Sequence, residues 1–213
     1  YTWLSGTAEY QGEPVERTVS GFARPAFRLS MNFYGAPALT LKEFADWEQD
    51  LIIGASLQVS PPWSQYDPGK LVNIGTNRWS FKPEIGVTKA LGAWTLEGAF
   101  GVTLFTDNDE FQGSNLRQQD PLYALQGHVV YNFNPRLWAA LDATFYQGGR
   151  TSINGAQKDD RQRNTRFGAT VARALNNRNS IKLNFSTGAS ARFGTNFTTV
   201  GLAWQHRWGA GLR

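Results

Sequence analysis

The stretch NRWSFKPEIGVTKALGAWTLEGAFGVTLFTDN, residues 77–108, alternates apolar and polar side chains along two runs separated by a short turn at 89–92. Alternation with a period of two places one kind of side chain on each face of a β-strand. Each run has about ten residues, which suits a tilted crossing of a hydrocarbon layer about 30 Å thick. Trp79 and Trp94, near the starts of the two runs, fit rings anchored at a membrane interface. Taken alone, these two alternating runs are equally compatible with a hairpin of a soluble β-sandwich.

The composition excludes a helical membrane protein but leaves a β-barrel open. Mean hydropathy is −0.41, and no run approaches the roughly 18 apolar residues of a transmembrane helix. The absence of cysteine excludes disulfides and thiolate metal sites. The formal net charge is +4, but the basic residues are scattered, so we expect no nucleic-acid partner.

The same alternation recurs along the rest of the chain. We expect about ten strands and almost no helix, and an even number fits a bacterial single-chain barrel. No linker divides the chain, so we expect one domain over residues 1–213. The further alternating segments are 1–10, 22–34, 51–59, 123–133, 137–146, 166–174, 181–185 and 200–208.

The connections between these segments alternate in length. Long polar connections fall at 61–77, 106–120 and 148–162, and short turns at 89–92, 134–135 and 176–179. An outer-membrane barrel has long external loops and short periplasmic turns, whereas the Greek-key connections of a sandwich do not alternate in this way. The fold class we expect is therefore all-β, an antiparallel transmembrane β-barrel.

One helix is expected. Thr40 and Glu43 form a Ser/Thr-x-x-Glu capping box, which predicts a short helix near 41–47. This segment lies on the side of the short turns, so the helix should be periplasmic.

If the apolar face meets lipid, the alternate positions line the lumen. Charges are costly on the lipid side and cheap where they face water or one another. Among these lumen positions basic residues outnumber acidic ones, which predicts a weak preference of the channel for anionic or polar neutral solutes. The alternative is an ion network that plugs a narrow barrel. The expected lumen-lining residues are Arg24, Arg28, Lys82, Glu84, Glu97, Gln126, His128, Asp142, Tyr146, Arg166, Lys182 and Arg207.

The apolar phase carries aromatic rings and two prolines. Pro25 and Pro83 lack the N–H that a strand ladder needs, so we hypothesise a bulge or a lateral opening for apolar solutes beside them. The aromatic residues expected in lipid or at its interfaces are Phe27, Trp79, Phe81, Trp94, Phe100, Tyr131, Phe145, Trp204 and Trp208.

Catalysis and metal binding have little support. Of the two histidines, His128 lies on the polar phase beside Gln126, and His206 follows Trp204 on the apolar phase. Neither is accompanied by a recognisable nucleophile and orienting group. The run Asp107-Asn108-Asp109-Glu110 lacks the EF-hand spacing, so we expect a loop that is solvated or faces lipopolysaccharide. We expect no enzyme, no cofactor and no metal.

Seven motifs match one known family in order. They are YGAPA at 34–38, GASLQV at 54–59, RWSFKPE at 78–84, FTDN at 105–108, QDPLY at 119–123, GGRT at 148–151 and WQHRW at 204–208. The chain thereby resembles the outer-membrane channels named for the meta-pathway of phenol degradation. The resemblance implies a monomeric barrel of about twelve strands that admits small molecules, including apolar or aromatic ones.

The chain departs from that family at its start. It opens on Tyr1-Thr2-Trp3-Leu4, inside what would be the third strand, with no visible signal peptide. We therefore expect N-terminal strands to be missing, because an unclosed edge in lipid leaves backbone groups unsatisfied.

The function we expect is passive small-molecule uptake across the outer membrane of a Gram-negative bacterium. The partners would be outer-membrane lipid, lipopolysaccharide and the permeant. A closed structural barrel is the alternative, and an outer-membrane enzyme is a weaker one.

Overall fold

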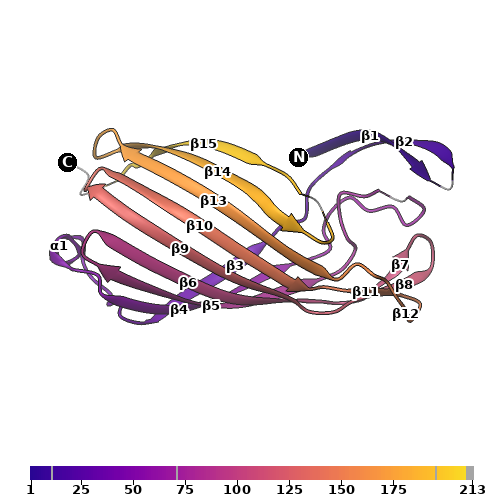
Figure 1. Cartoon of the computed structure of the whole chain (residues 1–213), viewed down its shortest axis with the longest axis horizontal. Coiled ribbons are helices and arrows are strands. Elements are labelled where there is room, and N and C mark those ends of the chain that lie inside the picture. The colour runs from indigo at the N-terminus through magenta and orange to yellow at the C-terminus, as the bar shows by residue number, and fades with distance from the viewer. Residues whose placement is uncertain (11, 71, 195, 210–213) are drawn as a thin grey trace.

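The computed structural model describes residues 1–10, 12–70, 72–194 and 196–209. Its main feature is a nine-stranded antiparallel sheet in the order β15-β14-β13-β10-β9-β6-β5-β4-β3. The sheet curls, so that β3 passes behind the strands at the front of the view (Figure 1). The strands are β3 (Phe27–Tyr34), β4 (Leu51–Ser60), β5 (Ser80–Leu91), β6 (Trp94–Phe105), β9 (Leu122–Asn134), β10 (Leu137–Gly148), β13 (Gln162–Ala174), β14 (Asn179–Ala191) and β15 (Thr199–His206). The expected all-β, antiparallel barrel-type fold is confirmed.

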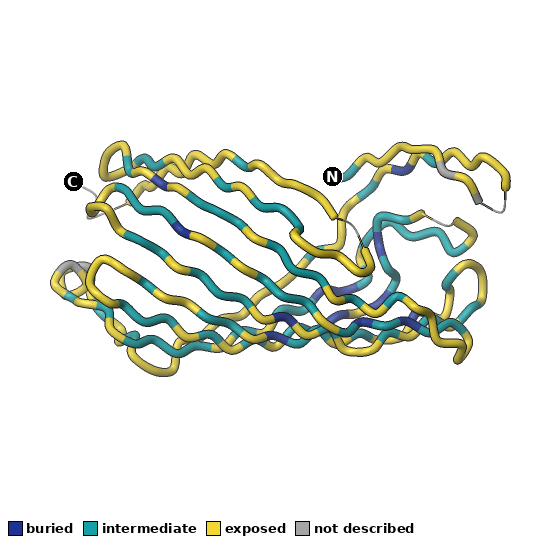
Figure 2. The backbone as a smooth tube through the Cα atoms, viewed as in Figure 1, coloured by how far each residue is buried: buried dark blue, intermediate teal, exposed yellow. Residues whose placement is uncertain are grey.

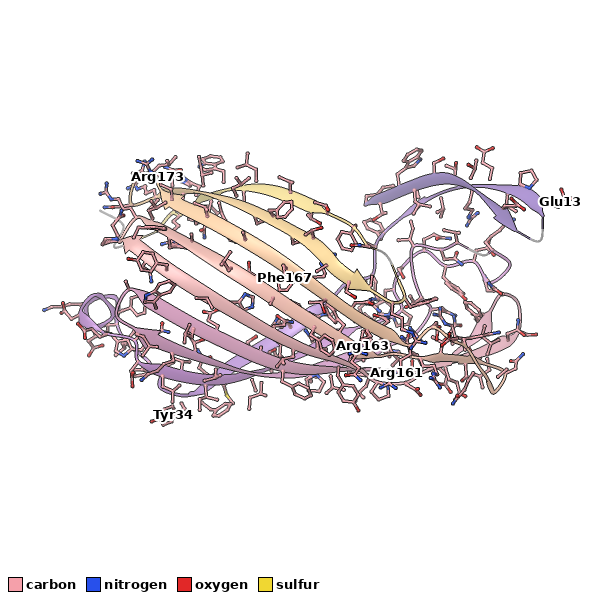
Figure 3. The ribbon with its side chains drawn as sticks, in the orientation of Figure 1. Glu13, Tyr34, Arg161, Arg163, Phe167 and Arg173 are labelled. Carbon is pink, nitrogen blue, oxygen red and sulfur yellow. The ribbon has the colours of Figure 1, made fainter. Side chains whose placement is uncertain are left out.

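The apolar face of this sheet is the more exposed one. Exposed and half-buried residues alternate along the long strands (Figure 2). Leu29 is 77% exposed and Leu202 76%, and Phe167, at mid-length of β13 in Figure 3, is 52% exposed. In the described part of the chain, the buried hydrophobic residues are Val19, Ala124, Ala140 and Ala172. Soluble monomers rarely expose contiguous apolar surface of this extent, so this face requires an apolar environment.

The two ends of the sheet differ. At one end lie the short turns between β5 and β6, β9 and β10, and β13 and β14, together with α1 (Leu41–Asp46) (Figure 1). The expected helix and its capping box are both present. The Glu43 carboxylate accepts hydrogen bonds at 2.8 Å from the backbone N–H and the hydroxyl of Thr40. These two hydrogen bonds hold the pKa of Glu43 below its ordinary value, and the bond from the backbone N–H has the larger effect.

At the other end, two of the expected polar loops form a second sheet. Its order is β12-β11-β8-β7, from β7 (Asn108–Phe111), β8 (Asn115–Gln119), β11 (Thr151–Ile153) and β12 (Ala156–Gln157). The long polar connections expected over 106–120 and 148–162 therefore contain short strands that the alternation did not predict. Asn154 and Gly155, between β11 and β12, both have positive φ, as a two-residue hairpin of type I′ requires. Gln112 and Gly113 also have positive φ, in the three-residue turn 112–114 between β7 and β8. The Asn-Gly pair was a hairpin signal that the periodicity argument missed.

The N-terminal segment forms a separate hairpin of β1 (Thr2–Tyr10) and β2 (Glu13–Gly21). The expected strand over 1–10 is present, but its only strand partner among the described residues is β2. The expected strand over 22–34 is wrong at its start, because β3 begins at Phe27. Arg24 and Pro25 therefore lie between strands, where Pro25 cannot interrupt a ladder.

Candidate functional site

The strand register places ten of the twelve predicted lumen residues on one face of the main sheet. His128, for example, lies opposite Glu97 on β6 and opposite Asp142 on β10. The other two, Arg24 and Arg207, lie just outside β3 and β15. Contact of this polar face with a lumen stays a prediction. The ten are Arg28, Lys82, Glu84, Glu97, Gln126, His128, Asp142, Tyr146, Arg166 and Lys182.

The predicted aromatic positions lie on the opposite face or at strand ends. Trp79 precedes β5 and Trp208 follows β15, so these two rings lie beside strand ends, where a membrane interface would be. Trp94 and Tyr131 are cross-strand partners with ring centroids 4.6 Å apart. The remaining positions within strands are Phe27, Phe81, Phe100, Phe145 and Trp204.

A first ionic cluster joins β3 and β5 on the polar face. The Glu84 carboxylate is 2.6 Å from Nη2 of Arg28 and 2.7 Å from Nζ of Lys82. Gly101 on β6 gives Lys82 its room, because a Cβ there would lie 2.9 Å from Cε of Lys82. One acid is thus shared by two cations, which leaves a net positive charge.

A second cluster crosses β6, β9 and β10. Nδ1 of His128 lies 2.5 Å from Oδ1 of Asp142, and Glu97 occupies the opposite cross-strand position. The other histidine, His206, is 2.9 Å from Oδ1 of Asn179. The hydrogen-bond partners of the two imidazoles are thus a carboxylate and an amide, which orient the rings.

Arg166 is held against β14 and the segment after it. Its guanidinium donates to Ser186 Oγ at 3.0 Å and to the Phe197 carbonyl at 3.1 Å. It also lies 4.1 Å from the centroid of the Phe197 ring. Three contacts restrain this cation on the polar face, where the alternation predicted it.

Arg78, at the loop end, was missed by the sequence argument. It is 6% exposed, lies 4.4 Å from the Phe105 ring centroid and donates to Gln119. Burial, followed by the nearby cations Arg117 and Arg24, lowers the pKa of Arg78 to about 10. It therefore stays charged at neutral pH. No feature of the local sequence marked Arg78 as buried, since burial arises from loops that meet only in the fold.

The ladder on one side of Pro83 is interrupted. β4 pairs with β5 continuously through Leu57 and Pro83. Between β5 and β6, the pairs stop at Phe81 and resume at Glu84. The interruption agrees with the missing N–H of proline.

Several hollows lie along the polar face of the described strands. One of about 310 Å³ is lined by residues that include Arg28, Glu84, Glu97 and His128. A larger one, of about 730 Å³, lies at the short-turn end. Within the described residues, no three or more His, Cys, Asp or Glu residues are placed to hold a metal ion. The described helix is too short and too polar to cross a membrane.

Three comparisons with known proteins bear on this site. The family described as "Putative MetA-pathway of phenol degradation" matches residues 1–207. The chain is also similar to the solved COG4313 outer membrane channel from Pseudomonas putida F1. The two share 22% sequence identity with a TM-score of 0.76, over 89% of this chain and 68% of that one. No curated protein matches the chain. At this identity, the structural likeness establishes the fold.

Proposed function

The chain belongs to the family named for the MetA pathway of phenol degradation, and from this we propose that it is a passive channel for small molecules. Its place would be the outer membrane of a Gram-negative bacterium, as a monomer in contact with lipid and lipopolysaccharide. The similar solved structure is an outer membrane channel, which supports this role. The finer proposal is that the permeants include small hydrophobic or aromatic compounds, and the family's name supports it.

The proposal rests on the two faces of the main sheet: the exposed outer face is apolar, and the opposite face carries the charged residues. Large apolar side chains such as Leu141, 68% exposed, cover one face from β3 to β15. Charged residues lie on the other face: Glu84 is paired with Arg28, and Asp142 is hydrogen-bonded to His128. Lipid on one side and water on the other satisfies both faces, which is the arrangement of a transmembrane β-barrel.

Planar-bilayer recording tests the channel. Purified, folded protein should give discrete current steps, and a salt gradient should give a reversal potential that reports ion selectivity. Heat-unfolded protein in the same detergent is the control and should give none. If circular dichroism shows the strand content of folded protein but no current steps are recorded, the channel function is contradicted and a closed structural barrel is favoured.

A lateral route beside Pro83 is a second proposal, favoured by the ladder interruption between β5 and β6. An apolar solute could leave the lumen for lipid where backbone pairing is absent. Pro83→Val should restore pairing and slow the transfer of a neutral aromatic dye into vesicle lipid, while ion conductance is unchanged. Ile85→Val, at the next outward position of β5, is the matched control. Equal transfer rates in the two variants would refute the lateral route.

A further inference from the structure

The charge of this chain is strongly uneven along its length. No acidic residue follows Asp160, whereas nine of the 21 lysines and arginines do. This final part contains the whole of β13, β14 and β15, which are three neighbouring strands at one edge of the main sheet. That part of the wall is therefore cationic without internal compensation.

Backbone hydrogen bonds bring several of these cations to one rim, together with Arg136 on the turn between β9 and β10. The N–H of Ala174 donates to the Arg136 carbonyl at 2.8 Å, and the N–H of Arg207 donates to the Arg178 carbonyl at 2.7 Å. The turn between β9 and β10, the turn between β13 and β14, and the end of β15 are thus adjacent. Lys182 lies farther in, on the polar face opposite Ala172.

These side chains surround the larger hollow. Its volume is about 730 Å³, and its lining includes Arg136, Arg173, Arg178, Lys182 and Arg207 but no Asp or Glu. In the described residues, the ion pairs involve none of Arg136, Arg173, Lys182 and Arg207. The contrast with Arg28 and Lys82, which share Glu84, shows that the chain neutralises cations elsewhere on the same face.

An aromatic ring completes the hollow. Trp138 on β10 lies opposite Ala172, in the same cross-strand row as Lys182. A guanidinium presents paired donors that match a carboxylate, and an ammonium adds a point charge. An indole face supplies apolar contact for a planar ring. The volume is within the range of small-molecule sites, about 300–1,000 Å³.

We propose that this hollow is a binding site for small aromatic carboxylates at the short-turn end of the channel. The carboxylate would sit among Arg136, Lys182 and Arg207, and the ring against Trp138. Like charges gathered in one hollow repel one another, and a bound anion relieves that repulsion. The inference rests on the proposed channel function and names the charged class of permeant that it would retain.

Calorimetric titration tests the site, with the protein folded in a neutral detergent that contains no anionic lipid. Benzoate is the probe, and phenol is the counterpart with the same ring and no carboxylate. Benzoate should bind at least tenfold more tightly than phenol, and its affinity should fall as salt rises, because screening weakens exposed charge interactions.

Two charge-matched double variants locate the site. Lys182→Gln with Arg207→Gln should weaken benzoate binding at least tenfold. Arg161→Gln with Arg163→Gln removes the same charge at the far end of β13 from Arg173 (Figure 3) and should leave binding unchanged. Equal effects of the two variants would overturn the assignment, as would equal affinities of the unaltered protein for benzoate and phenol. The second comparison needs no variant to fold.

The same preparation separates this inference from the channel itself. Current steps without selective benzoate binding would support the channel function and refute the anion site. Selective benzoate binding without current steps would support the site and contradict passive conduction.

Discussion

Glu84 illustrates how single residues shape the polar face. Its carboxylate pairs with Lys82 on the same strand, β5, and with Arg28 on β3, across the intervening strand β4. Gly101, the cross-strand partner of Glu84 on β6, leaves the space that Lys82 fills. A glycine is needed there because of a close side chain, not because of its backbone conformation.

A methyl group at this position should therefore disturb the cluster. We expect Gly101→Ala to displace the Lys82 ammonium from Glu84 and to lower the free energy of unfolding by about 0.5–1 kcal/mol, the scale of a partly exposed ion pair. Gly86→Ala on β5 is the control, since its Cβ would find its nearest atom at 3.6 Å. Urea unfolding in micelles measures both. Equal midpoints would show that the lysine contact contributes nothing.

At the scale of elements, Asn108 holds the loop end together. It begins β7, is 1% exposed, and its amide donates to the Tyr66 hydroxyl at 2.9 Å and to the Thr76 carbonyl at 3.2 Å. Its carbonyl oxygen accepts from the Glu110 N–H at 3.1 Å. One side chain thus connects the segment 61–77 to the β7–β8 hairpin.

Removing that side chain should loosen the loops without unfolding the main sheet. Asn108→Ala removes the hydrogen bonds to the part-buried Tyr66 hydroxyl and Thr76 carbonyl, at a cost of about 0.5–1.5 kcal/mol each. Limited proteolysis should then cleave residues 61–77 faster, while strand content by circular dichroism is unchanged. Asp109→Ala, one exposed residue along, is the control. Unaltered cleavage in Asn108→Ala would contradict this role.

The cap of α1 should depend on pH. Donation from Thr40 lowers the pKa of Glu43 in the folded protein. This contribution is complete above the ordinary glutamate pKa, about 4.3, and is lost as pH falls through the lowered value. Carbon-13 NMR of the Glu43 carboxyl should give a midpoint below the ordinary value. Thr40→Val removes the hydroxyl donor and should raise that midpoint; an unchanged midpoint would exclude the hydroxyl as a cause.

At the scale of the whole molecule, the two faces of the main sheet are suited to different environments, the apolar face to lipid and the polar face to water. Neighbouring residues on one strand therefore differ in what they tolerate. Leu183 is 51% exposed on the apolar face of β14, and Asn184 is next to it on the polar face.

An arginine at each position distinguishes the faces. Leu183→Arg should destabilise the protein folded into lipid vesicles by about 2–4 kcal/mol, the cost of a cation at mid-membrane. Asn184→Arg should cost less than about 1 kcal/mol, because its charge would face water. The urea midpoint of folding into vesicles measures both effects. Equal losses would mean that the apolar face does not meet lipid.

The sequence alone identified the strands of the main sheet, their two faces, the short turns, the helix near 41–47 and the family. It did not identify β2 or the short strands of the loop end. These features depend on contacts between near neighbours in the chain: period-two alternation, a capping box and short motifs. Ten predicted polar positions accordingly share one face. The family match over residues 1–207 confirms the resemblance.

Three-dimensional folding determines which distant residues meet. It paired β8 with β11 into a sheet over the loop end, buried Arg78 beside Phe105, and set β1 and β2 apart from the main sheet. It also gathered Arg136, Lys182 and Arg207 around one hollow. Such contacts depend on cross-strand register and on loops that pack together, and alternation is identical for every register shift of two residues.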